Sequence, residues 1–158
     1  MSRHEDHTSL AEKLSEIARA AKLTVAVAES LTSGRIASAL GASSSSSEWF
    51  LGGVVAYSRK VKHEVLGVPP GPVVSEEAAR AMAEGVRDLT GADLGASATG
   101  AGGPEGQDDQ PPGTVFIAVA DGGRTHVREL HLDGEPADVL GRTTTAVLEA
   151  LIASSTTE

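Results

Sequence analysis

The short run TVAVA at residues 24–28 is the feature that most constrains the fold of this chain. It is uncharged and rich in valine, and polar and apolar residues do not alternate in it, so we expect a central strand covered on both faces. Leu10 and Leu14 precede it at helical spacing, and Ser9 with Glu12 forms a capping-box pattern, which predicts a first helix beginning at Ser9. A buried strand between helices is typical of an α/β protein.

The rest of the chain continues this alternation of helices and strands. Thr32 is placed to cap a second helix that ends near Leu40, and Ser75 to cap a later helix that ends near Gly91. Further strands are expected at residues 50–57, 93–98, 114–120 and 124–132, the last two as an antiparallel hairpin, with a charged helix at 58–66 and a closing helix after Pro136. This order predicts a three-layer α/β/α fold with a mixed, mostly parallel sheet.

A chain of 158 residues is the usual size of one domain with one hydrophobic core. Only 3% of the residues are aromatic, so that core must be built from aliphatic side chains. We expect a disordered tail at residues 1–8, a single domain at 9–154 and a C-terminal tail at 155–158.

The charge of the chain argues against some classes of partner. A net charge of -9 without a cluster of Lys and Arg does not suit nucleic-acid binding. The polar N-terminus does not resemble a signal peptide, and no apolar run approaches the roughly 20 residues that span a bilayer. Together with the absence of cysteine, this predicts a cytoplasmic protein that does not associate with membranes.

Two segments follow predicted strands where an open α/β sheet gathers its ligands. In the first, residues 28–34, Ser30 stands at a strand-to-helix turn, where backbone amides can face a developing oxyanion. The plainer interpretation is that Ser30 and Thr32 merely cap the helix. The second, residues 99–113, contains Gly100, Gly102 and Gly103, which can let the backbone approach a ligand but occur as often in a plain turn.

A nucleophilic serine needs a base, and the histidines are poorly placed for that role. Of the five, only His63 falls on a helix near other candidate residues. Lys60 and Lys62, close to Tyr57, are alternative bases if burial or another cation lowers the pKa of one of them, although both can equally be solvated surface charges. No spacing of His or acidic residues matches a known metal site, so we predict no metal and no cofactor.

Several blocks of the sequence resemble the CinA C-terminal-domain family, whose active members are nicotinamide-nucleotide amidases (PncC). The matching blocks are VAVAESLTSG at 25–34, WFLGGVVAYS at 49–58, Lys62, LGV at 66–68, VS at 74–75, TGAGGP at 99–104 and PGTV at 112–115. They cover roughly residues 10–152 in one order, and this combination is far more specific than any single block.

The resemblance implies hydrolysis of nicotinamide mononucleotide to nicotinate mononucleotide and ammonia in pyridine-nucleotide salvage. It implies Ser30 as nucleophile, Lys62 as general base and Tyr57 as a hydroxyl that positions or relays the proton. It further implies a homodimer that binds a small pyridine nucleotide. The residues it implies for substrate binding are Thr32, Ser33, Gly34, Thr99, Gly100, Gly102, Gly103 and Arg142, the last suited to a phosphate.

The sequence departs from the family pattern at two places. Ser33 stands where the family has glycine, and a glycine there would permit φ > 0 or a close approach of substrate. The glycine loop also differs and carries an acidic insert at residues 105–109. The alternative function is therefore a catalytically impaired member that binds a nucleotide or a protein partner in the same crevice. A weaker alternative is a phosphate-binding module recognised through the Gly100 loop.

Overall fold

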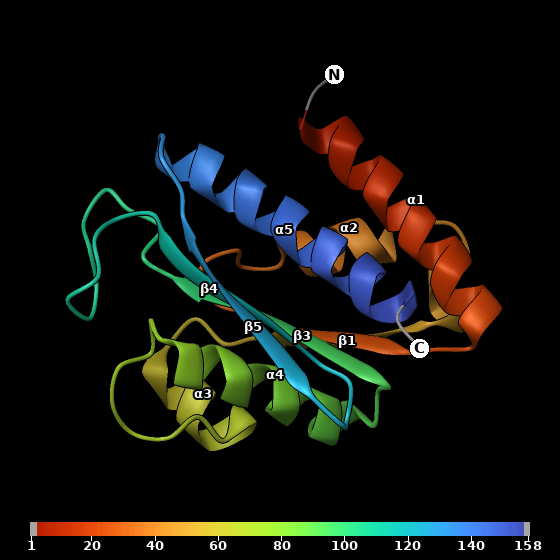
Figure 1. Cartoon of the computed structure of the whole chain (residues 1–158), viewed down its shortest axis with the longest axis horizontal. Helices are drawn as coiled ribbons and strands as arrows, with labels where there is room; N and C mark the ends of the chain where they lie inside the picture. Colours follow the sequence, from red (N-terminus) through yellow and green to blue (C-terminus); the bar gives the residue numbers. More distant parts are fainter. Residues whose placement is uncertain (1–2, 157–158) are drawn as a thin grey trace.

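The fold is a five-stranded sheet with helices on both faces, as the computed structural model shows for residues 3–156 (Figure 1). The helices are α1 Arg3–Ala21, α2 Arg35–Gly41, α3 Arg59–Leu66, α4 Glu76–Thr90 and α5 Pro136–Thr156, with a short 3-10 helix at Ser46–Glu48. The strands are β1 Val25–Glu29, β2 Phe50–Val55, β3 Leu94–Gly100, β4 Thr114–Ala120 and β5 Thr125–His131. The predicted three-layer α/β/α fold is confirmed.

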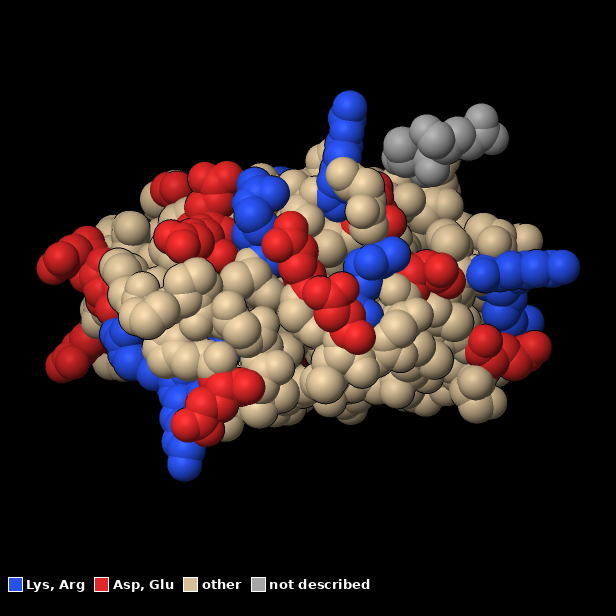
Figure 2. Space-filling view, turned by 90° about the horizontal axis from the view of Figure 1, so that it is seen from below, with Lys and Arg blue, Asp and Glu red and all other residues tan. Residues whose placement is uncertain are grey.

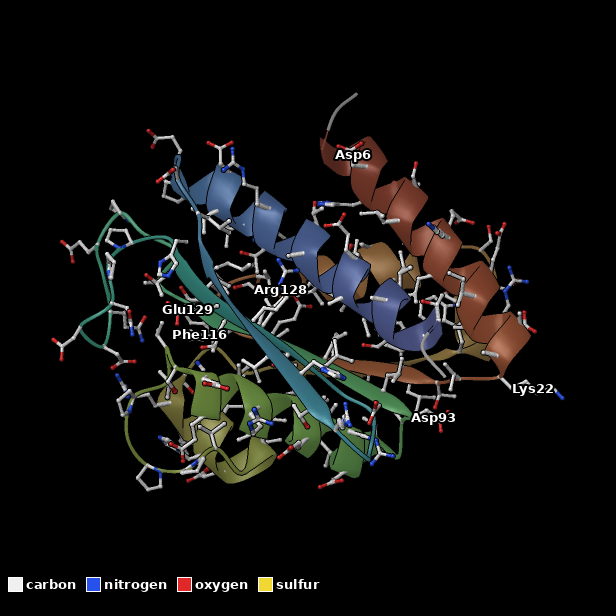
Figure 3. The ribbon with its side chains drawn as sticks, in the orientation of Figure 1. Asp6, Lys22, Asp93, Phe116, Arg128 and Glu129 are labelled. Carbon is white, nitrogen blue, oxygen red and sulfur yellow. The ribbon has the colours of Figure 1, made fainter. Side chains whose placement is uncertain are left out.

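The sheet has the strand order β2-β1-β3-β4-β5. Strand β1 pairs in parallel with both β2 and β3, whereas β3–β4 and β4–β5 are antiparallel, so β4 runs against the other four. The mixed, mostly parallel sheet and the hairpin are therefore confirmed. Asp93, which is labelled in Figure 3, directly precedes β3. Its carboxylate accepts hydrogen bonds from the amide and hydroxyl of Thr24 at 2.8 and 3.0 Å, which ties the residue before β1 to the residue before β3.

Aliphatic side chains fill both layers between sheet and helices. Helices α1, α2 and α5 cover one face, and α3 and α4 cover the other (Figure 1). All five residues of β1 are buried, as expected for a central strand. The single tryptophan, Trp49, is 1% exposed, and its indole N–H donates to the Ser15 hydroxyl at 3.1 Å, so its polar atom has a partner inside the core.

Helix α1 begins at Arg3 and not at Ser9, so residues 3–8 are helical where a disordered tail was predicted. The reason is tertiary: His7 Nε2 lies 3.0 Å from both the Gly141 carbonyl oxygen and the Thr145 hydroxyl of α5. The predicted capping box is also wrong, because the Glu12 carboxylate accepts a hydrogen bond from the Ser44 amide at 2.7 Å.

At the C-terminal end of the chain, α5 continues to Thr156, into the predicted C-terminal tail. The rest of both predicted tails, residues 1–2 and 157–158, lies outside the described residues.

The cap of helix α2 is a carboxylate from the preceding strand and not the hydroxyl of Thr32, as was predicted. Gly34 is the N-cap residue, with φ 101°, and Glu29 reaches over the turn. Glu29 Oε1 and Oε2 accept from the amides of Ile36 and Ala37 at 3.0 and 2.9 Å, and the side chain is only 1% exposed. Predicted hydroxyl caps are confirmed elsewhere, since Ser75 accepts from the Ala78 amide of α4 at 3.1 Å.

We expect Glu29→Gln to destabilise the protein by about 1–3 kcal/mol, because its amide group would present N–H to one of the two helix amides that the carboxylate now accepts. Urea unfolding followed by circular dichroism measures this change. Glu16→Gln, on the exposed face of α1, is the matched control and should unfold like the wild type. Equal midpoints for Glu29→Gln and the control would contradict the capping role.

Candidate active site

A pocket of about 320 Å³ lies at the carboxyl ends of β1 and β3, between these strands and the first turns of α5. Its walls include Ser30, Tyr57, Gly100, Gly102 and Gly103, which are five of the residues predicted for the site. The other lining residues are Leu31, Ala101, Glu105, Gln107, Pro136 and Leu140. A larger pocket of about 600 Å³ between β4, β5 and α5 contains none of the predicted residues.

The position of Ser30 is fixed by the sheet. It directly follows β1, and its amide donates to the Ala98 carbonyl of β3 at 3.0 Å. Its own carbonyl accepts from the Ser33 amide at 3.1 Å, which closes the turn toward α2. Ser30 is 7% exposed and lines the pocket, so a nearly buried hydroxyl meets a cavity at a strand-to-helix turn.

Lys62 is a buried amine on α3, a helix that the Ser58 hydroxyl caps by accepting from the Val61 amide at 3.1 Å. The Lys62 side chain is 2% exposed, and its Nζ donates to the Tyr57 carbonyl at 3.0 Å. Burial, and next the positive charge of Arg59, lower the pKa of Lys62 from 10.5 to about 8. An amine that titrates there is able to accept a proton near neutral pH.

The alternative bases have surroundings that do not suit catalysis at this pocket. Lys60 is exposed on the same helix, as the surface-charge interpretation expected. The His63 ring is bound to the Val68 carbonyl, with its Nδ1 2.7 Å from that oxygen. In the described chain no hydrogen bond joins Lys62 to Ser30. Tyr57 is common to both surroundings, because its carbonyl accepts from the Lys62 amine and it lines the pocket together with Ser30.

Of the turn after Ser30, Leu31 lines the pocket, whereas Thr32, Ser33 and Gly34 do not. Ser33 has φ 47°, which confirms that the residue standing in place of the family's glycine adopts the left-handed region. Gly34 is the helix cap described above. Thr32 is fully buried, and its hydroxyl has no hydrogen-bond partner in the described structure.

Two residues implied for substrate binding lie away from the pocket wall. Thr99 is 1% exposed and donates its hydroxyl proton to the Val73 carbonyl at 2.6 Å, so it ties β3 to the segment before α4. Arg142 lies on the exposed side of α5, where its guanidinium donates to the Asp133 carbonyl at 3.4 Å. The structure therefore brings Ser30, Tyr57 and the glycine loop together and leaves these two outside.

Sequence reasoning missed the role of Asp108, which fastens the loop that carries the glycines. Its carboxylate accepts from the Arg59 guanidinium at 2.5 Å and from the amides of Val73 and Val74 at 2.9 and 3.0 Å. Burial alone would raise the pKa of Asp108, but these hydrogen bonds hold it below its ordinary value. The only signal in the sequence was the acidic insert itself.

Charges around the pocket are sparse. Glu105 is the one charged residue among the lining residues, and no Lys, Arg or His is among them. On the face covered by α3 and α4, Lys and Arg side chains are interspersed with Asp and Glu and form no continuous basic patch (Figure 2).

Within residues 3–156 no group of three or more His or acidic side chains could hold a metal ion. No helix in that range is long and apolar enough to cross a membrane.

We expect Ser33→Gly to stabilise the protein by about 0.5–1 kcal/mol, because glycine adopts a positive φ without the steric cost that serine bears. Chemical denaturation measures the change. Ser33→Ala keeps the unfavourable φ and removes only a hydroxyl that is 3.3 Å from the Ser30 carbonyl, so it should not share the gain. A Gly variant no more stable than the wild type would show that the turn is not strained.

The buried amine should also leave a signature in the pH dependence of stability. Between about pH 8 and 10.5 the unfolded chain binds more protons at Lys62 than the folded one, so stability should rise with pH through that window. Lys62→Met should lack this rise and be more stable than the wild type at pH 7 by an order of 1–3 kcal/mol, after allowance for the lost hydrogen bond.

Thermal unfolding from pH 7 to 10.5 tests this, with Lys60→Met as the matched control on the same helix. The control should follow the wild-type profile. If Lys62→Met also followed the wild-type profile, burial would not destabilise the charged amine of Lys62, and the lowered pKa of this residue would be contradicted.

Comparison with known proteins identifies the family. The profile of the CinA family, described as the CinA C-terminal domain, matches residues 7–154. A CinA-like protein of Geobacter sp. (strain M21) is 42% identical over 138 residues, 83% of this chain and 33% of the relative. A CinA-like protein of Syntrophus aciditrophicus (strain SB) is 51% identical over 116 residues, 70% of this chain and 28% of the relative. The chain thus spans about a third of the length of the relatives it matches.

Solved structures agree with these matches. The crystal structure of a competence-damaged protein (CinA) superfamily protein from Escherichia coli has a TM-score of 0.90 and 32% identity, covering 92% of this chain and 88% of the other. A competence or damage-inducible protein from Enterobacter asburiae has a TM-score of 0.91 and 32% identity, covering 95% and 98%. By sequence and by fold, this chain belongs to the CinA family through its C-terminal domain.

Proposed function

We propose that the protein is a serine amidase that hydrolyses the carboxamide of nicotinamide mononucleotide to nicotinate mononucleotide and ammonia. The observation that carries this proposal is the buried amine of Lys62, with a pKa of about 8, bonded to the backbone of Tyr57 beside a pocket that Ser30 lines. A serine and a lysine suffice for acyl transfer when the amine is deprotonated near neutral pH. The amide substrate itself comes from the family resemblance.

The reaction begins with transfer of the Ser30 hydroxyl proton to the Lys62 amine. Since no direct hydrogen bond joins them in the free protein, the proton passes by way of the Tyr57 hydroxyl, through a water molecule or after a tightening of the site on binding. The Ser30 oxygen then attacks the amide carbon, and backbone amides of the Ser30 turn or of the glycine loop stabilise the oxyanion.

Collapse of this intermediate breaks the C–N bond. The Lys62 ammonium donates its proton to the leaving nitrogen, ammonia departs, and the acyl group remains on Ser30. Water, deprotonated by the same amine, then attacks the ester and releases the carboxylate product while Ser30 recovers its proton. Each proton taken by Lys62 is returned within the cycle, and no atom changes its oxidation state, so no redox partner is needed.

The pocket wall suits a ligand with a positively charged ring. Tyr57 offers an aromatic face and Glu105 a carboxylate, and no basic side chain lines the cavity to repel a pyridinium. The phosphate would project from the mouth of the pocket toward the first turns of α5, where Arg142 is exposed.

We place this activity in the cytoplasm, in nucleotide salvage. We also propose a homodimer, for which the exposed Leu51 and Val55 of edge strand β2 offer an uncharged surface.

The second candidate is a nucleotide-binding member without turnover. The serine side chain at position 33, where the family has glycine in the turn that would supply oxyanion amides, favours it. The two functions share the pocket and differ only in whether the amide bond breaks.

Ser30→Ala should reduce ammonia release from nicotinamide mononucleotide by at least about 10³-fold, because the nucleophile is lost, while the affinity for the nucleotide changes little. The assay follows ammonia without added metal, and calorimetry follows binding. Ser38→Ala, at an exposed position of α2 outside the pocket, is the control and should retain turnover. Folded wild-type protein that binds the nucleotide but releases no ammonia would favour the second candidate.

A further inference from the structure

Asp108 is a largely buried carboxylate outside the pocket that joins three segments of the chain. Its side chain is 10% exposed, and it belongs to the loop between β3 and β4. One oxygen accepts from Arg59 on α3, and the other accepts from the amides of Val73 and Val74, just before α4. The Thr99 hydroxyl binds the Val73 carbonyl from β3, so the same short segment is held from both sides.

Arg59 and Lys62 are three residues apart on α3, a spacing that places two side chains on one face of a helix. The Arg59 guanidinium therefore opposes a positive charge on Lys62, and the Asp108 carboxylate favours it. These are the two charged groups that act on the amine, one from its own helix and one from the loop packed against it. Arg59 is also held by the Gly71 carbonyl, to which it donates at 3.2 Å.

We propose that Asp108 is a positioning residue that, paired with Arg59, sets the charge on the Lys62 amine. This rests on the proposed function of Lys62 as the base. The loop that contains Asp108 also carries Glu105 and Gln107, which line the pocket, so the Asp108–Arg59 pair fastens part of the pocket wall beside the proposed base. Without the Asp108 carboxylate, the Arg59 guanidinium would act on Lys62 without its counter-ion.

A purely structural latch would make a different prediction. If Asp108 only pinned the loop, its loss and the loss of Arg59 would affect the protein in the same direction, because each contributes to one ion pair. If the pair sets the charge on Lys62, the two losses must act in opposite directions on the protonation of that amine, because the two charges have opposite signs.

Selective labelling makes Lys62 directly observable, since the chain has only four lysines: Lys13, Lys22, Lys60 and Lys62. In protein labelled with ¹³C at the lysine ε-carbon, Lys62→Met assigns the Lys62 signal, and its chemical shift is followed between pH 6 and 11. Asp108→Asn keeps an oxygen for the backbone amides and removes the charge, so the Lys62 titration should move to lower pH. Arg59→Met should move it to higher pH, and the double variant should fall between the two.

Asp109→Asn is the matched control, because it removes the same charge from the exposed neighbouring residue of the loop and should leave the Lys62 titration unchanged. The acid limb of kcat/KM for ammonia release should move in the same directions as the titration. Titrations of the Asp108 and Arg59 variants that are unchanged, or that both move to higher pH, would overturn the proposal. Since the titration needs no turnover, it tests the role of Asp108 even if the protein releases no ammonia, an outcome that would refute the amidase alone.

Discussion

The burial of one amine shapes the surroundings of the pocket. Lys62 is 2% exposed, and a cation in such a place is costly unless it is hydrogen-bonded, paired or neutralised. Two features reduce this cost. The Tyr57 carbonyl accepts a hydrogen bond from the Lys62 amine, and the lowered pKa of Lys62 makes its neutral form accessible. The burial that lowers the pKa of Lys62 for its proposed role as a base also weakens the folded state, which is the usual conflict between stability and activity.

Sheet topology explains how distant parts of the chain meet at the pocket. Parallel pairing of β1 with β2 and β3 puts the ends of these strands at one edge, where Ser30, Tyr57 and Gly100 follow or end them. The Ser30 amide is held by the Ala98 carbonyl, so Ser30 is positioned by the sheet and not by the turn that follows it. Strand β4 then reverses direction, and the long connection before it brings Asp108 back across α3.

Much of this could be predicted from local patterns. The uncharged run that became β1 indicated a central strand, and the order of elements indicated the layers. Ser30, Tyr57 and Lys62 could be named because they sit in the motifs that resemble the family, and the glycine preference at Ser33 correctly indicated a positive φ. The site residues remain predictions in their catalytic roles.

What could not be predicted depends on contacts between distant residues. No local pattern shows that Glu29 would cap α2 from the preceding strand, or that His7 would hold the first turns of α1 on α5. The position of Arg142 outside the pocket wall depends on how α5 packs on the sheet. Asp108 was visible only as one acid among several in an insert, because its partners lie more than 30 residues away.

The central claim is that Ser30 becomes acylated by the amide substrate with Lys62 as the base. Rapid quenching of the protein with nicotinamide mononucleotide, followed by mass spectrometry of the intact and digested chain, tests it most directly. The account predicts a transient adduct on the Ser30 peptide with the mass of the substrate less ammonia, absent in Lys62→Met. Ammonia release without any such adduct at early times would contradict the account and indicate direct attack by water.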